Sequence, residues 1–269
     1  MNIFSSFFER YSLFLFFALT IPITFAIAFL PFPADILPFL MVLVPSVMAI
    51  VLAGVTGGRK SIGALLKKLV QWRVSFKWYA ITLAVALAVR LSMSLLALAL
   101  GWIQSIQIRR WTPVQFMAFF VMLYIAAALE ELGWRGFALP KLLVRRSALF
   151  SGLLVGVLWG TVHLALHLPG MILSASPWPA TVIGLIGLSL VITWLFVNTE
   201  GSLVIASLYH AAQSFFVIVN DGITGPQQSW LQAIASVVVA LGVIVLTGPD
   251  LRRGHAKRLE ARTETPTSP

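Results

Sequence analysis

The chain contains no cysteine and has few charged side chains. Its 269 residues include nine aspartates and glutamates and four histidines. Without cysteine, the chain cannot use a disulfide framework, a thiol nucleophile or a cysteine metal site. Charged residues make up 10% of the chain, whereas soluble proteins carry about 25%. The composition therefore excludes a soluble globular protein.

Long apolar runs occupy most of the chain, of which 59% is hydrophobic. A membrane-spanning helix needs about 20 mostly apolar residues. The sequence predicts eight such spans, at approximately 11–30, 36–54, 78–100, 113–131, 148–168, 179–198, 202–220 and 229–248. We expect an all-α, polytopic integral membrane protein with one domain over residues 1–250. The polar composition of residues 251–269 predicts a disordered cytoplasmic tail.

The net charge of +10 is distributed unevenly along the chain. If the N-terminus is cytoplasmic, sixteen of the 19 basic residues fall in cytoplasmic segments, while Arg109 and Arg110 fall in an outside loop and Arg90 falls within a span. The positive-inside rule therefore predicts that both termini are cytoplasmic. The basic charge suits an anionic lipid leaflet and does not indicate a nucleic-acid partner. The absence of an organelle signal favours a bacterial plasma membrane.

Residues 57–77 interrupt the apolar pattern. Leu65, Leu66, Leu69 and Val70 recur at helical spacing, with Lys67, Lys68 and Arg73 on the opposite side. This pattern predicts an amphipathic helix at the membrane surface. The alternative is a solvated cytoplasmic loop.

Two adjacent carboxylates, Glu130 and Glu131, lie at the end of an apolar run and are followed by Arg135. An ionised side chain at bilayer depth costs about 2.5–3.5 kcal/mol on insertion scales, and such groups usually face a cavity or a partner. Residues four apart share a helix face, so Glu131 and Arg135 are predicted to form an ion pair. Glu130 then points elsewhere and is a candidate base. The alternative is an acidic helix terminus among the lipid headgroups.

Two later spans carry histidines. Trp159, His163 and His167 follow at steps of four and are predicted to share one face of the fifth span, which Pro169 ends. His210 and Ser214 have the same spacing on the seventh span. An isolated histidine in such a place often only bonds a neighbouring backbone group. Polar groups on three apolar helices, however, converge on a cavity.

Such a cavity suits hydrolysis by activated water. A carboxylate and an imidazole take a proton from water, and a second imidazole with Ser214 or Gln213 stabilises the oxyanion. Arg90 has three interpretations: it pairs with a buried glutamate, contacts substrate, or extends toward an interface.

Three motifs in order resemble the CPBP family of intramembrane endopeptidases, which includes type II CAAX prenyl proteases and bacteriocin-processing (Abi-type) proteins. The motifs read Glu130-Glu131-Leu132-Gly133-Trp134-Arg135-Gly136, then Trp159-Gly160-Thr161-Val162-His163, then His210 to Ser214. The resemblance covers roughly residues 113–220. It implies an eight-helix protease whose intramembrane cavity faces the cytoplasm.

The resemblance also implies roles for individual residues. Glu130 and His163 would activate water, and His210 would stabilise the oxyanion. Glu131 is counted with the catalytic residues, and Arg135, Trp159, His167 and Ser214 with the supporting ones. Two positions depart from the family pattern: Ser214 replaces an asparagine, and Trp159 replaces a phenylalanine.

Metal dependence is open at this stage. The water-activating pair needs no ion, and we expect a metal-free site. The alternative is zinc held by Glu130, His163 and His210, which are suitable ligands by type.

The expected partners are a peptide or lipidated-peptide substrate and membrane lipid. Two other functions compete with proteolysis: a non-catalytic protein that binds a hydrophobic peptide, as an immunity protein would, and a small proton-coupled transporter.

Overall fold

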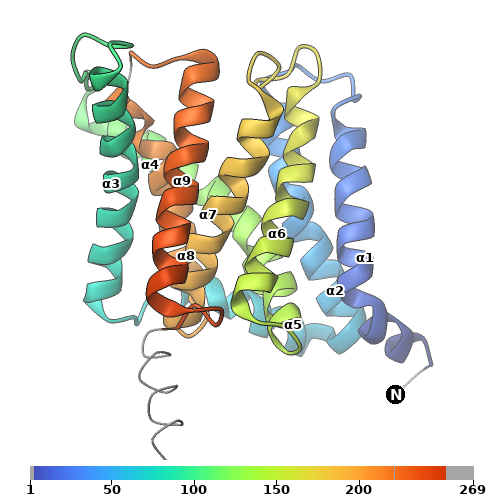
Figure 1. The fold of residues 1–269 in the computed structure, drawn as a ribbon. Coiled ribbons are helices and arrows are strands. Elements are labelled where there is room, and N and C mark those ends of the chain that lie inside the picture. Colours follow the sequence, from blue (N-terminus) through green and yellow to red (C-terminus); the bar gives the residue numbers. More distant parts are fainter. Residues whose placement is uncertain (1–2, 221, 253–269) are drawn as a thin grey trace, which may run out of the picture.

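A computed structural model describes residues 3–220 and 222–252, and this part of the chain is built from helices joined by short loops (Figure 1). The main helices are α1 (Ile3–Ile27), α2 (Leu37–Lys67), α3 (Phe76–Ala99), α4 (Pro113–Glu131), α6 (Ala148–His163), α7 (Trp178–Asn198), α8 (Leu203–Phe215) and α9 (Gly225–Thr247). Short elements extend or connect them: η1 (Lys68–Val70), η2 (Leu132–Ala138), α5 (Leu139–Leu143), η3 (Leu164–His167) and η4 (Phe216–Asn220). The predicted tail from residue 253 onward lies outside the described residues.

Within the described ranges, seven helical segments are long and apolar enough to cross a membrane. The seventh predicted span, 202–220, is shorter: the apolar helical stretch there is Leu203–Val219. The all-helical membrane fold is therefore confirmed, while the count of eight full-length spans is not.

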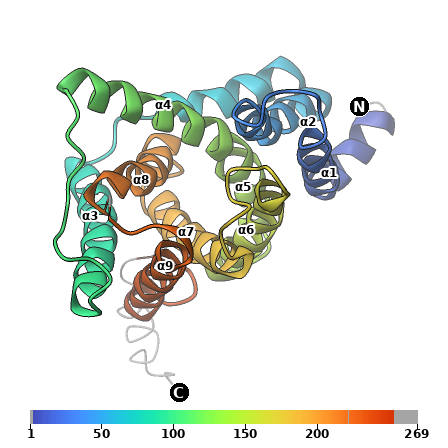
Figure 2. The same cartoon turned by 90° about the horizontal axis from the view of Figure 1, so that it is seen from above.

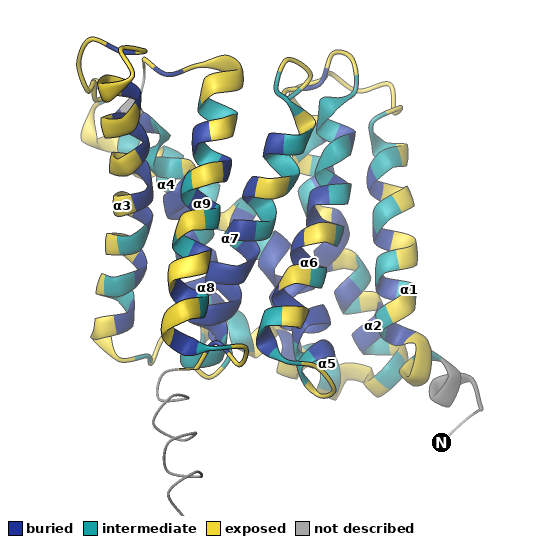
Figure 3. Cartoon of the chain, viewed as in Figure 1, coloured by how far each residue is buried: buried dark blue, intermediate teal, exposed yellow. Residues whose placement is uncertain are grey.

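Large apolar side chains such as Val245 and Leu246 are more than 80% exposed, and exposed residues lie along the outer faces of the helices (Figure 3). An apolar outer surface of this kind fits a lipid environment.

Helix α2 changes direction at Gly58 and then continues. The predicted amphipathic segment is therefore helical through Lys67 and the 3₁₀ turn η1, whereas residues 71–75 join it to α3 as a loop. Gly58 has φ 61° and ψ −158°, a backbone conformation that glycine adopts without a steric cost. Helix continues to Lys67, with Leu65 buried and Leu66 40% exposed. The position of this helix at a membrane surface stays a prediction.

Helix α7 lies among α6, α8 and α9, as the view from above shows (Figure 2). Close packing depends on small residues where helices meet. A Cβ on Gly187 of α7 would lie 2.7 Å from the backbone of Ser236 in α9, and one on Gly156 of α6 would lie 2.9 Å from the Cα of Ile186. The glycines at 152, 156 and 160 thus form the face by which α6 meets α7.

The two ends of the bundle differ in charge. One end carries the start of α1, the segment from Gly58 to Ser75, and α5, with most of the described basic residues (Figure 1). The other end carries the loops at 28–36, 100–112 and 168–177. We call these the basic end and the loop end.

Candidate active site

The paired glutamates lie where α4 passes into a π-helical turn. Helix α4 begins with a capping box, in which Gln115 N donates to Thr112 Oγ1 and Thr112 N donates to Gln115 Oε1. The helix ends at Glu131 and continues as the π turn η2. Such turns inside helices are rare and frequently occur at functional sites.

Three contacts fix this junction. Ser46 Oγ of α2 donates to the carbonyl of Leu129, one residue before Glu130. Lys68 Nζ donates to the carbonyl of Gly136 over 2.8 Å. Gly133 lies directly against α2, since a Cβ there would be 2.5 Å from the Cβ of Pro45. The sequence alone gave no sign that the basic segment supports the acidic motif.

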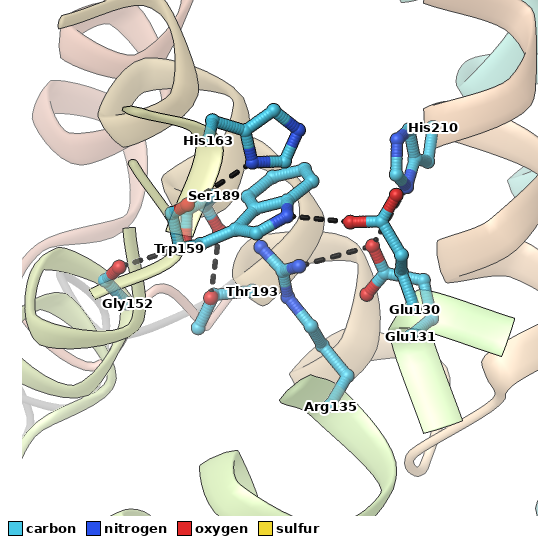
Figure 4. Close-up of polar contacts among 9 residues, drawn as sticks. All are labelled: Glu130, Glu131, Arg135, Gly152, Trp159, His163, Ser189, Thr193 and His210. Atoms are coloured by element: carbon cyan, nitrogen blue, oxygen red, sulfur yellow. Dashed lines mark hydrogen bonds and ion pairs between the residues drawn. The ribbon is translucent and has the colours of Figure 1, made fainter. Parts of the chain in front are cut away.

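Glu131 is fully buried between Arg135 and His210 (Figure 4). Its Oε1 accepts a hydrogen bond from Arg135 Nη1 at 3.0 Å and another from His210 Nδ1 at 3.0 Å. The predicted Glu131–Arg135 pair is therefore confirmed. The bond from His210 could not be predicted, because it joins α8 to α4 across 79 residues of sequence.

Glu130 points to a different partner, as its place on the helix predicted. Its Oε2 accepts a hydrogen bond from the indole Nε1–H of Trp159 at 2.6 Å, and its side chain is almost fully buried (Figure 4). A phenylalanine at 159 could not donate this bond.

Trp159 connects the groups of the site. Its buried ring lies edge-on to His163 and His210, with centroid distances of 5.4 and 5.0 Å. The guanidinium carbon of Arg135 lies 4.7 Å from the ring centroid, in a cation–π contact. The sequence marked Trp159 only as a supporting residue.

The hydrogen bonds of the two histidines define their tautomers. His163 Nδ1 lies 3.0 Å from the carbonyl oxygen of Trp159, and a carbonyl only accepts, so Nδ1 carries the proton. In the neutral ring Nε2 is then a free base. His210 likewise holds its Nδ1 proton toward the carboxylate of Glu131.

Glu130 and His163 line one cavity of about 160 Å³, together with Thr24 of α1 and apolar residues of α2 and α6. Water occupies about 30 Å³ in the liquid, so this cavity has room for a water molecule beside both groups. Its other lining residues include Thr24, Pro38 and Ile172, which lie near the loop end.

The position of this cavity bears on one prediction. We expected a cavity facing the cytoplasm, and we also expected the basic end to be cytoplasmic. The lining residues of the cavity lie toward the loop end, and the side of the membrane on which that end lies stays a prediction. The motif pattern carried no information about depth, because it orders residues along the chain and not across the bilayer.

Three predicted residues do not join the carboxylates. His167 lies on the 3₁₀ turn η3 and not on α6; its Nδ1 is 3.1 Å from the carbonyl oxygen of Ser176, and its Nε2 is 3.1 Å from Thr181 Oγ1. Ser214 is exposed to a second cavity. Arg90 does not pair with a glutamate among the described residues, and its Nη2 donates to the carbonyl of Gln213.

The three candidate zinc ligands are turned toward separate partners: Glu130 toward Trp159, the Nδ1 of His163 toward a carbonyl, and the Nδ1 of His210 toward Glu131. Over residues 3–220 and 222–252, no three acidic or histidine side chains are grouped as metal ligands would be. Both imidazoles keep Nε2 clear of these bonds, as metal-ligating histidines also do, so the expectation of a metal-free site stays a prediction.

Comparison with known proteins identifies the region that carries these groups. Residues 110–216 match the family described as type II CAAX prenyl endopeptidase, Rce1-like, and this range includes all three motifs. The central region of the chain resembles this family. CAAX prenyl protease 2 of Methanococcus maripaludis is 28% identical over 102 residues, which is 35% of this chain and 38% of that relative. The matches confirm the predicted CPBP resemblance, over well under half of the relative's length.

Proposed function

We propose that the chain is an intramembrane endopeptidase of the CAAX type, which hydrolyses a peptide bond near the C-terminus of a hydrophobic or lipidated substrate. The main support is the cavity shared by Glu130 and His163, where a carboxylate and a free imidazole nitrogen face the same small space. The Rce1-like match over the same region adds to it.

In the proposed reaction, Glu130 and the Nε2 of His163 take a proton from a water molecule as its oxygen attacks the scissile carbonyl carbon. His210, held by Glu131, stabilises the resulting oxyanion. The tetrahedral intermediate then collapses, the C–N bond breaks, and the transferred proton goes to the leaving amine. Arg135 and Trp159 hold the two glutamates apart.

We further propose that this reaction needs no metal. The support is that Glu130 and both imidazoles already have partners that suit acid–base roles. Cleavage is expected to continue in the presence of a strong chelator.

The first test is peptide cleavage by the purified protein in detergent, with a library of peptides that have prenylated or apolar C-termini. Glu130→Ala and His163→Ala are each expected to reduce cleavage by about 10²–10⁴-fold, the usual contribution of a general acid–base group. Both variants should stay folded, as judged by gel filtration and thermal unfolding. Glu200→Gln, at an exposed carboxylate, is the matched control and should retain full activity. Retained cleavage in either test variant would exclude the mechanism.

We also propose that the basic end is cytoplasmic, so that the site draws its substrate from the opposite side of the membrane. The chain has no cysteine, so a single introduced cysteine is a unique probe. Ser174→Cys at the loop end is expected to react with a membrane-impermeant maleimide in intact cells, whereas Ser75→Cys at the basic end reacts only after permeabilisation. Both serines are exposed. The reverse labelling pattern would restore a cytoplasm-facing cavity.

A further inference from the structure

Arg90 lies within the membrane-spanning part of α3, and it is 4% exposed. Only its Nη2 has a described partner, the carbonyl of Gln213 at 3.2 Å. Its Nε and Nη1 are buried without a hydrogen-bond partner, and neither ion pair found among the described residues includes it. A buried, uncompensated guanidinium is costly inside a membrane and marks a functional position.

The surroundings of Arg90 form a cavity built for a polar ligand. Arg90 lines a space of about 400 Å³ between α3, α7, α8 and α9. The same walls carry side-chain amides and hydroxyls, among them Thr181, Gln213, Ser214 and Gln232, beside apolar leucines. Among the described residues that line this cavity, Arg90 supplies the only formal charge, so no described carboxylate repels an entering anion.

The cavity adjoins the candidate active site through α8. Gln213 and Ser214 follow His210 by about one helical turn, a rise of about 5.4 Å. An extended peptide advances about 3.3–3.6 Å per residue. A group held at Arg90 would therefore bring a peptide bond a few residues away to the level of His210.

We propose that Arg90 binds the C-terminal carboxylate of the peptide substrate. A guanidinium matches a carboxylate in geometry and can donate two parallel hydrogen bonds to it. The free Nε and Nη1 of Arg90 supply such donors. The side-chain amides of Gln213 and Gln232 can bond the peptide groups that precede the carboxylate. Arg90 thus fixes how far from the chain end cleavage takes place. This inference rests on the proposed function, because it assigns the substrate's end to a subsite of that enzyme.

The test measures binding apart from cleavage. A short fluorescent peptide with an apolar C-terminus is prepared with a free carboxylate and with a carboxamide, and each is titrated onto the inactive Glu130→Ala protein in nanodiscs of zwitterionic lipid. The carboxylate form is expected to bind about 10–100-fold more tightly, as charged hydrogen bonds contribute about 1.5–3 kcal/mol. If the carboxylate and carboxamide peptides bind with equal affinity, the proposal is overturned, and no variant of Arg90 is needed to show it.

Two variants then locate the effect. In the Glu130→Ala background, Arg90→Gln should abolish the preference for the carboxylate and leave the carboxamide affinity unchanged. Arg110→Gln removes the same charge from an exposed loop at the same end of the bundle and should keep the preference. A preference that survives Arg90→Gln in folded protein would overturn the assignment.

A lipid phosphate is the competing source of negative charge. Anionic phosphatidylglycerol in the nanodisc could displace the peptide from the protein with Arg90 but not from Arg90→Gln. If it does, and if the free carboxylate gives no advantage over the carboxamide, the site binds lipid and the peptide assignment is wrong. If the carboxylate preference is found but active protein cleaves nothing, the subsite stands and the proposed protease activity fails.

Discussion

Replacement of Glu131 by alanine is expected to destabilise the protein by about 3–5 kcal/mol, the usual effect of removing one partner from a buried ion pair. Arg135 is fully buried and has Glu131 as its ion-pair partner in the described structure. Without that carboxylate, a positive charge stays inside the bundle uncompensated. Thermal unfolding of the purified protein in detergent measures the effect, and cleavage should be lost as well.

The neighbouring carboxylate provides the control. Glu130→Ala removes an acceptor from Trp159 but leaves the Glu131–Arg135 pair intact, so its unfolding temperature should stay much closer to that of the wild type. The double variant Glu131→Met/Arg135→Met removes both charges and should recover much of the stability without recovering cleavage. A Glu131→Ala protein as stable as the wild type would show that the pair does not hold this region together.

Gly133→Ala is expected to displace the π turn and to cost about 1–3 kcal/mol, which is typical of an overpacked interior. The new methyl group would lie 2.5–2.6 Å from the Cβ, carbonyl carbon and carbonyl oxygen of Pro45. The carbonyl atoms belong to the backbone of α2 and the Cβ belongs to the proline ring, so none of them can move aside as a flexible side chain does. We expect cleavage to fall at least tenfold, because Glu130 and Glu131 adjoin the displaced turn.

Gly63→Ala is the matched control for this substitution. Gly63 lies in the helical segment after the bend of α2, and a Cβ there meets nothing within 4 Å. Alanine is favoured over glycine in a helix by up to about 1 kcal/mol, so this variant should be as stable as the wild type or slightly more so. If Gly133→Ala behaves in the same way in unfolding and cleavage, the close contact with α2 has no functional importance.

Most of the fold could be predicted from the sequence because each span must bury about 20 apolar residues in lipid. The predicted boundaries failed where helices continue past the apolar run. Helix α2 extends through Gly58 to Lys67, and α4 continues through the π turn into α5. The short helix α8 was the other exception, since apolar composition does not distinguish a full span from a shorter helix followed by a 3₁₀ turn.

The candidate site was predictable only where its geometry is local. The Glu131–Arg135 pair follows from helical spacing and is confirmed. The shared face predicted for His163 and His167 is wrong, because the helix tightens to a 3₁₀ turn from Leu164 onward and the step of four residues no longer repeats the direction. The contacts of Trp159, His210 and Arg90 join distant segments, and no pattern within one helix encodes them.

The π turn also limits how this chain can change in length. A turn of this kind holds an extra residue relative to an α-helix. Deleting one residue between 132 and 138 would restore the α-helical path and rotate everything after it by about 100° relative to α4. A deletion before Arg135 would also move its guanidinium away from Glu131, and in every case α5 would lose its place beside α6. Loops tolerate insertions and deletions, whereas this segment is fixed in length by the groups on either side of it.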